Sequence, residues 1–304
     1  MTAEVDWTFG GTWRYEPHWF DSPDGRMHYI DEGPRDGSTV VLAHGNPTWA
    51  YLYRNFIGPL SQAGHRAIAF DHLGFGRSDK PDRPELYTIR RHCERAEALL
   101  ESLQLREATV VPQDWGGPIA LWWATRHPDR VRSLFILNTF AHRPPERVRL
   151  PLPLRLFRTP GVGEVMVKGL DLFKRVFLFR AGVVHRDRLT SDVKQAYRAP
   201  HPSWSSRTPI LVFPREIPSG PEGPVSDLNA EIEAGLEQHF RSKPVKIAWA
   251  MKDIAFTPEM LEGLWLRTFP DAEAMRIEDA GHYLQEDAHE LIVPQLLEFL
   301  NRTG

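Results

Sequence analysis

The segment Val110–Gly117 reads V-V-P-Q-D-W-G-G, and the interpretation of the whole chain depends on it. Its apolar start has the β-branched composition of a buried strand, and Gly116 and Gly117 open a helical stretch. Asp114 therefore stands on a tight strand-to-helix turn, where neighbouring residues must be small because larger side chains would collide. Pro112 departs from that rule and makes the turn stiffer than usual.

Asp114 has two interpretations when it is considered alone. Aspartate is a common N-cap residue, so it could simply begin the helix. It could also be a nucleophile, because a carboxylate is already ionised at neutral pH and needs no base to activate it. The positive end of the following helix would help to keep it charged.

The rest of the chain alternates β-rich runs with helical ones, which predicts βαβ units and a mostly parallel sheet covered on both faces. The expected strands are 26–30, 39–43, 66–70, a strand beginning at 109–112, 133–137, 245–250 and 274–277. The expected helices are 49–63, 89–105, 117–126, 227–240, 258–268 and 289–301. This pattern predicts one α/β domain.

The alternation stops between about Phe140 and Val225, where the chain is rich in Pro and Arg and shows no strand pattern. We therefore expect an α/β core of residues 1–139 and 226–304 and a helical cap of residues 140–225. The stretch Arg143–Arg188 is both basic and apolar. It is either a solvated cap face with its apolar side on the core, or an amphipathic surface for self-association or membrane contact.

Composition excludes several classes of protein. The formal net charge of −3 over 304 residues gives no reason to expect nucleic acid or an acidic membrane surface as partner. No apolar run is long enough to span a bilayer, and residues 1–10 do not resemble a secretory signal. The single Cys93 cannot form an internal disulfide. We expect a soluble, cytoplasmic enzyme.

Three further loops support the nucleophile interpretation of Asp114. His44–Thr48 (HGNPT) lies between a strand and a helix, where an oxyanion-hole loop is expected, with the backbone N–H groups of Asn46 and Trp115 as donors. Asp253 and His282 each follow an expected strand. The order nucleophile, acid, histidine is that of the α/β-hydrolase fold, which implies a mostly parallel eight-stranded sheet with an inserted helical cap.

Together these motifs resemble the haloalkane dehalogenases. The resemblance rests on HGNPTWAYLYRN, DHLGFGRSDKP, QDWGGPIAL, MKDIAFTP and AGHYLQED, with PHWFDSPDGRMHYIDEG near the start and AYRAP at 196–200. It covers nearly the whole chain and is nearest to the subgroup with an Asp-His-Asp triad and an Asn/Trp halide pair. Residues 140–225 match less specifically, so family knowledge of the substrate pocket transfers poorly.

The resemblance implies a reaction in two steps. Asp114 displaces halide from a small halogenated hydrocarbon and forms an alkyl-enzyme ester, and a water activated by His282 then hydrolyses that ester while Asp253 orients the histidine. The indole N–H of Trp115 and the side-chain amide of Asn46 would hold the halide ion. Self-association of the chain is also expected from the resemblance.

Other candidate residues are less favoured. Some relatives carry their triad acid just after the sixth strand, but Asn138 there cannot be a charged partner, which leaves Asp253. His44 and His72 are interpreted as structural, and Trp204 as a packing residue in the cap. No metal-binding or nucleotide-binding motif occurs, so no metal or cofactor is implied.

Several alternative functions share the fold. Epoxide hydrolases usually need two cap tyrosines, and this cap holds only Tyr197. Fluoroacetate dehalogenases typically carry arginine where this chain has Trp115. The resemblance implies that β-lactone decarboxylases of the same subgroup keep the same triad and the Asn/Trp pair, so the motifs do not separate them from dehalogenases. A non-catalytic hydrolase-fold receptor would have little reason to retain all of these groups.

Overall fold

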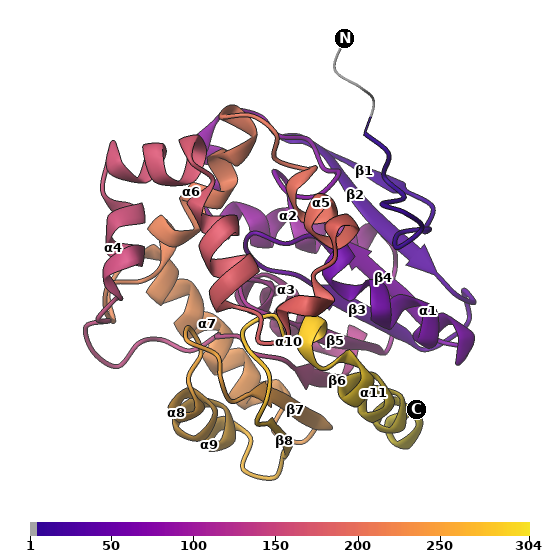
Figure 1. The fold of residues 1–304 in the computed structure, drawn as a ribbon. Coiled ribbons are helices and arrows are strands. Elements are labelled where there is room, and N and C mark those ends of the chain that lie inside the picture. The colour runs from indigo at the N-terminus through magenta and orange to yellow at the C-terminus, as the bar shows by residue number, and fades with distance from the viewer. Residues whose placement is uncertain (1–4) are drawn as a thin grey trace.

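The computed structural model describes residues 5–304 and contains one eight-stranded mixed sheet with helices on both faces (Figure 1). The strands are β1 (His18–Ser22), β2 (Gly25–Glu32), β3 (Thr39–Ala43), β4 (Arg66–Phe70), β5 (Ala108–Pro112), β6 (Val131–Ile136), β7 (Val245–Ala250) and β8 (Glu273–Ile277). Their spatial order is β1-β2-β4-β3-β5-β6-β7-β8. The pairs β1–β2 and β2–β4 are antiparallel and the others are parallel. The expected α/β architecture is confirmed.

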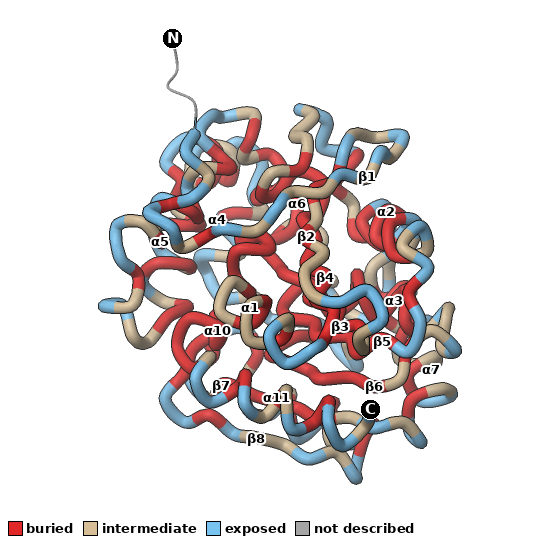
Figure 2. Tube along the Cα trace, turned by 90° about the vertical axis from the view of Figure 1, so that its right-hand side faces the viewer, coloured by how far each residue is buried: buried red, intermediate tan, exposed pale blue. Residues whose placement is uncertain are grey.

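The parallel strands are buried on both faces, so their side chains alternate between two separate cores. Val41, Val110 and Ile247 lie in one core with residues of α2 (Ile89–Ser102), α3 (Gly116–Arg126) and α7 (Pro224–His239). Val40, Val111 and Ala248 lie in the other with residues of α1 (Arg54–Gln62) and α11 (His289–Thr303). Figure 2 shows this interior as a continuous set of buried segments. Such double burial produces the continuous apolar strand runs seen in the sequence.

The edge strand β1 has no counterpart among the strands expected from the sequence. Its residues HWFDS alternate between half-buried and exposed, so neither face carries an apolar pattern. It pairs only with β2, through a hairpin in which Ser22 lies opposite Gly25. The turn sequence Pro23-Asp24-Gly25, with Gly25 at φ 140°, was the available signal.

Residues 140–225, called the cap segment below, lie in the chain between β6 and β7, which are neighbours in the sheet. The described part of this segment contains no strand. It holds α4 (Leu152–Arg158), π-helical turns at Glu164–Gly169 and Phe173–Ala181, short 3₁₀ turns at Arg186–Arg188 and Ser205–Arg207, α5 (Ser191–Arg198) and α6 (Thr208–Glu216). These helices lie beyond the carboxyl ends of the parallel strands (Figure 1).

The remaining short helices complete the α/β region. They are 3₁₀ turns at Ala50–Tyr53, Pro84–Tyr87 and Pro128–Arg130, α8 (Pro258–Met260), a π-helical turn at Leu261–Trp265, α9 (Leu266–Thr268) and α10 (Leu284–Asp287). No helix among residues 5–304 is both long and apolar enough to cross a bilayer. Cys93 is buried in α2, and burial raises the pKa of its thiol, which fits a structural side chain.

Candidate active site

Asp114 lies on the turn between β5 and α3 with φ 52°, in the left-handed region that non-glycine residues rarely adopt. Its backbone N–H donates to the carbonyl of Asn138 over 2.8 Å. A Cβ on Gly45 would lie 2.0 Å from the Asp114 carboxylate, and a Cβ on Gly116 would lie 2.1 Å from the Ala43 carbonyl. The turn therefore requires glycine at both positions.

One backbone N–H group forms a hydrogen bond to the Asp114 carboxylate: that of Asn46, which donates to Oδ1 over 2.7 Å. Burial raises the pKa of Asp114, although the charge of His282 and the nearby backbone N–H groups of Trp115 and Asn46 oppose the rise. The carboxylate is thus poorly solvated, with Oδ1 held by the Asn46 N–H and Oδ2 facing the histidine.

His282 and Asp253 come from loops after β8 and β7, and the sheet brings them together beside Asp114. His282 Nε2 lies 3.6 Å from Asp114 Oδ2, and His282 Nδ1 lies 2.9 Å from Asp253 Oδ2. The backbone N–H groups of Ala255 and Phe256 donate to Asp253 Oδ1 over 2.7 Å and 3.1 Å. Burial lowers the pKa of His282, but Asp253 and Asp114 together raise it to about 9.

The raised pKa of His282 gives the chemistry a defined pH dependence. With a pKa of about 9 the resting imidazole is protonated at neutral pH and cannot act as a base. An ester on Asp114 removes one of the negative charges that raise this pKa, so the pKa must fall in the intermediate. We expect ester hydrolysis in single turnovers to accelerate with rising pH and then level off below pH 9. Acceleration toward low pH would contradict this assignment.

Asn138 is a functional contact that the sequence did not reveal. Its Nδ2 donates to Asp253 Oδ2 over 3.0 Å and to the carbonyl of Ala250 over 3.2 Å, while its Oδ1 accepts from the Ala250 N–H over 2.7 Å. It cannot be a charged partner itself, but it holds the carboxylate of Asp253, the predicted triad acid. Its position just after β6, beside the end of β7, was the only signal.

Asn138→Ala is therefore expected to reduce both stability and the rate of ester hydrolysis. It leaves the buried N–H and carbonyl of Ala250 without this side chain, which costs about 1–3 kcal/mol for each unsatisfied group. Urea unfolding measures the stability, and the pH profile of ester hydrolysis measures the loosened Asp253–His282 pair. An unchanged pH profile in a destabilised variant would show that Asn138 is only structural.

The side chains of Trp115 and Asn46 lie beside the carboxylate on opposite loops. The Trp115 ring packs edge-on against Phe140 and Phe213, and no hydrogen bond within residues 5–304 involves its indole N–H. The Asn46 Nδ2 donates to the carbonyl of Ile210 in the cap segment over 3.3 Å. The indole N–H of Trp115 is thus available to bind an anion, and the side-chain amide of Asn46 is held only by one long hydrogen bond.

Two cap side chains lie away from the triad. The hydroxyl of Tyr197 donates to Glu286, which also forms a bidentate ion pair with Arg54. Trp204 is 48% exposed, and its ring packs over Gly169, so its role as a packing residue rather than a halide donor stays a prediction. Neither side chain donates to the triad, whereas Gln113, which the sequence did not single out, donates from Nε2 to the His282 carbonyl over 3.0 Å.

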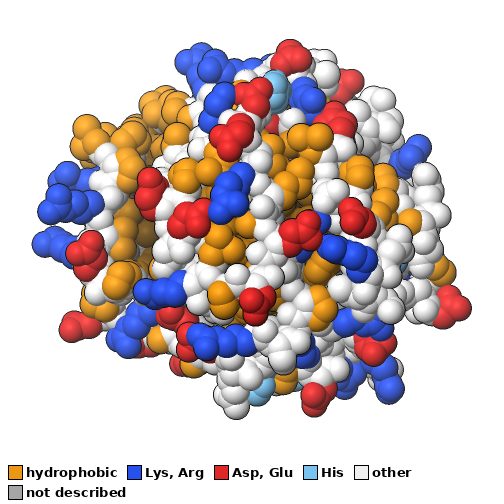
Figure 3. Space-filling view, turned by 90° about the horizontal axis from the view of Figure 1, so that it is seen from below, with side chains coloured by type: hydrophobic (Ala, Val, Ile, Leu, Met, Phe, Trp, Pro, Cys, Tyr) orange, Lys and Arg blue, Asp and Glu red, His pale blue; other side chains and the backbone are white. Residues whose placement is uncertain are grey.

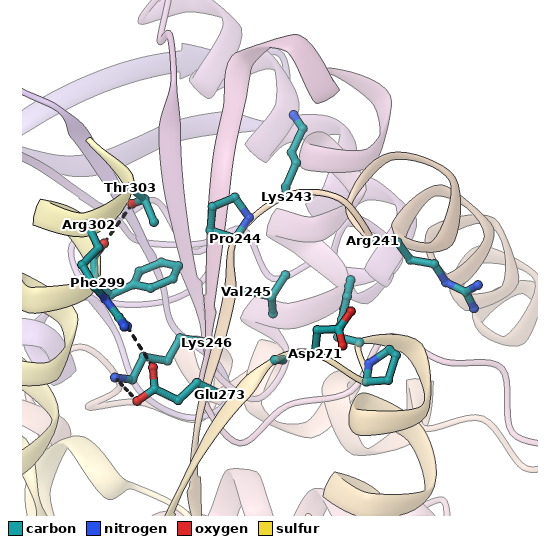
Figure 4. A pocket seen from close by; sticks show the side chains of 13 residues that line it. Arg241, Lys243, Pro244, Val245, Lys246, Asp271, Glu273, Phe299, Arg302 and Thr303 are labelled. Atoms are coloured by element: carbon teal, nitrogen blue, oxygen red, sulfur yellow. Dashed lines mark hydrogen bonds and ion pairs between the residues drawn. The ribbon is translucent and has the colours of Figure 1, made fainter.

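A separate cavity of about 440 Å³ lies at the amino-terminal ends of β7 and β8, away from the triad (Figure 4). Three of its charged groups pair with one another: Lys246 and Arg302 both bind Glu273, as the dashed lines in the figure show. The Nζ of Lys243 donates to the Pro128 and Val131 carbonyls. None of the predicted site residues lines this cavity.

Comparison with known proteins identifies similar sequences. A family model described as alpha/beta hydrolase fold matches residues 38–289. The cis-3-alkyl-4-alkyloxetan-2-one decarboxylase of Shewanella oneidensis is 35% identical over 291 residues, 95% of this chain and 89% of that protein. Haloalkane dehalogenase 2 of Mycobacterium tuberculosis is 34% identical over 284 residues, 93% of this chain and 94% of that protein.

Solved structures of haloalkane dehalogenases are similar to this chain over nearly its whole length. Haloalkane dehalogenase DbeA from Bradyrhizobium elkani superposes with a TM-score of 0.86 and 28% identity, covering 95% of this chain and 99% of that one. The tetrameric haloalkane dehalogenase DpaA from Paraglaciecola agarilytica gives 0.78 and 28%, covering 96% and 93%. The similarity extends over the cap segment as well as the sheet.

Proposed function

The chain belongs to the alpha/beta hydrolase fold family, in the branch that holds haloalkane dehalogenases and cis-oxetanone decarboxylases, and from this premise we propose that it hydrolyses haloalkanes to alcohol and halide. The observation that carries the proposal is the Asp114 carboxylate itself: Oδ1 accepts from the Asn46 N–H, Oδ2 faces His282, and Trp115, whose indole N–H takes part in no hydrogen bond within residues 5–304, is the next residue in the chain. In this arrangement the Asp114 carboxylate would attack a halogen-bearing carbon while the indole N–H of Trp115 binds the departing halide.

The first proposed step is an in-line displacement by Asp114. Oδ2 forms a bond to the halogen-bearing carbon, and the carbon–halogen bond breaks with its electron pair leaving on the halide. Because Oδ1 accepts from the Asn46 N–H over 2.7 Å, Oδ2 is the oxygen with a free lone pair toward the reacting carbon. Trp115 and the Asn46 amide, once released from Ile210, would stabilise the departing anion.

The second proposed step hydrolyses the ester. Water attacks Cγ of Asp114 as His282 Nε2 takes its proton, and the alcohol leaves with that proton. Negative charge develops on Oδ1, to which the backbone N–H of Asn46 already donates, and the N–H of Trp115 is the second donor that the sequence predicts. Asp253 stabilises the imidazolium through its contact with Nδ1.

β-Lactone decarboxylation is a second candidate, favoured by the 35% identity to the Shewanella decarboxylase. The carboxylate of Asp114, with the N–H donors beside it, is also suited to open the strained four-membered ring of a β-lactone. Epoxide hydrolysis is less favoured, because the hydroxyl of Tyr197 is bound to Glu286. A receptor without catalysis would bind ligand and form no product. The cytoplasmic location and the division into core and cap domains stay predictions.

A substrate panel separates these candidates. The protein is incubated with 1-bromobutane, 1,2-dibromoethane, an epoxide and a cis-3,4-dialkyl-β-lactone, while halide release and carbon dioxide are followed. Halide release from the haloalkanes supports the proposal. Turnover of the lactone alone would replace it with decarboxylation, and binding without any product would favour a receptor.

A further inference from the structure

The cap segment differs in charge from the rest of the protein. It contains 15 lysine and arginine residues and 7 aspartate and glutamate residues, a net charge of +8, whereas the whole chain carries −3. The remaining residues therefore carry −11. Such a separation of charge orients the molecule toward an anionic surface.

The exposed apolar side chains gather in the same segment. Of eleven large hydrophobic side chains that are exposed among residues 5–304, seven lie in the cap segment. They are Leu152, Leu156, Val162, Val165, Leu170, Val176 and Trp204. Leu152 and Leu156 share one face of α4 because they are four residues apart. The other four exposed hydrophobics of residues 5–304 lie apart in the chain, Trp19 on β1, Leu291 on α11, and Val5 and Ile254 in loops.

Unpaired arginines are interspersed among these apolar residues. Seven exposed arginines of the cap segment have no carboxylate within 4.0 Å in residues 5–304: Arg147, Arg149, Arg155, Arg175, Arg180, Arg186 and Arg198. Four of them, with Lys194 and Arg207, line a groove of about 1260 Å³. Free cations beside exposed leucine and valine are the composition of a surface that contacts a charged lipid interface.

Trp204 is a further exposed apolar residue of this group, and it lies in the C-terminal part of the cap segment. Its ring lies over Gly169, since a Cβ there would be 3.3 Å from the indole, and Lys168 Nζ lies 5.3 Å from the ring centroid. An exposed tryptophan beside a lysine is a side-chain pair that favours the headgroup region of a bilayer.

Self-association explains this surface less well. Two copies joined cap to cap would bring the free arginines together. A head-to-tail contact would satisfy the charges, but the acidic remainder of residues 5–304 exposes only four large apolar side chains to match. They are Val5, which lines the same groove as the cap arginines, and Trp19, Ile254 and Leu291, which are far apart in the chain. Figure 3 shows hydrophobic side chains beside Lys and Arg at the left edge, the side on which Figure 1 places α4.

We propose that the outer face of the cap segment binds a bilayer surface that carries anionic phospholipid headgroups. The arginines contact lipid phosphates, and the leucine, valine and tryptophan side chains enter the boundary between headgroups and acyl chains. Binding is peripheral and reversible, and it weakens with ionic strength because the exposed arginines are screened by salt. The proposal does not depend on which reaction occurs at Asp114.

Vesicle sedimentation tests the proposal. The full-length protein is mixed with phosphatidylcholine vesicles, or with matched vesicles in which one third of the lipid is phosphatidylglycerol, at low salt and at about 0.5 M salt. We expect sedimentation with the anionic vesicles at low salt, and little with neutral vesicles or at high salt. No sedimentation with anionic vesicles, or equal sedimentation with both, would overturn the proposal.

Two double variants assign the contact to the cap segment. Arg155→Glu with Arg175→Glu is expected to weaken partitioning at least about 30-fold, because each cation near an anionic surface contributes about 1 kcal/mol. Leu152→Ser with Val165→Ser is expected to weaken it as well. The matched controls are Arg106→Glu and Leu291→Ser, exposed residues outside the cap segment, which should change nothing.

Light scattering without lipid tests whether a second copy of the chain, instead of lipid, covers the cap segment. A cap-mediated oligomer that the Leu152→Ser/Val165→Ser variant dissociates would show that a second copy covers this face, and would overturn the proposal. An oligomeric state that is unchanged in this variant supports it, because the face is then free for lipid.

Discussion

Replacing His282 with phenylalanine is expected to leave the first displacement intact and to stop the reaction at the ester. With 1-bromobutane the variant should release one equivalent of bromide per protein and then no more, so that steady-state turnover falls by at least about 10⁴-fold. The reason is that no other base lies within hydrogen-bond reach of the Asp114 carboxylate among the described residues. Mass spectrometry of the peptide that contains Asp114 should show one added butyl group.

Two controls make this result specific. His289→Phe changes a partly buried histidine of α11 that lies outside the triad, and it should retain full turnover. Because Phe at position 282 leaves Asp253 without its histidine, circular dichroism must show that the variant folds, and His282→Asn gives a smaller alternative. A folded variant that binds 1-bromobutane but gains no adduct would contradict the covalent mechanism.

Asp114→Asn is expected to abolish turnover without loss of stability. The amide keeps an oxygen for the Asn46 N–H but is not a nucleophile, so the rate with every substrate should fall by at least about 10⁴-fold. Burial raises the pKa of Asp114, which means that the fold disfavours its charged form, and a neutral amide relieves this cost. Urea unfolding should therefore give a free energy of unfolding at least as large as that of the wild type.

The comparison of activity with stability distinguishes a nucleophile from a helix-capping residue. If Asp114 were only a helix-capping residue, its replacement would lower the free energy of unfolding of the protein by about 1 kcal/mol and leave activity nearly unchanged. Asp129→Asn, an exposed aspartate in the turn after α3, is the matched control and should alter neither quantity. If the Asp114→Asn variant retained turnover and had a smaller free energy of unfolding, Asp114 would be a helix-capping residue and not the nucleophile.

The sequence predicted the buried strands best. The expected limits of β3, β4 and β7 agree with the structure residue for residue, because strands that are buried on both faces carry continuous apolar runs. The edge strand β1 was not predicted, since hydrogen bonds to β2 rather than an apolar pattern hold it. In the cap segment the sequence indicated helices but could not set their limits.

For the candidate site, the sequence by itself determined the residue types and their order along the chain. Glycine at positions 45 and 116 is required by atoms within about 2 Å, and Asp114, Asp253 and His282 each follow a parallel strand. Since the carboxyl ends of parallel strands meet at one edge of the sheet, these side chains had to converge. The structure places the three in one hydrogen-bonded and ionic cluster.

Only the tertiary structure decided which partners complete this cluster. Asn138 reaches Asp253 from 115 residues away, and Tyr197 turns from the site to Glu286 at a separation of 89 residues. Trp204 packs over Gly169 while about half of it stays exposed. These outcomes depend on how the cap helices pack on the core and on which polar group each buried donor finds. Local patterns carry no information about such distant pairings, whereas the residue types at the strand ends and their order along the chain can be read directly from the sequence.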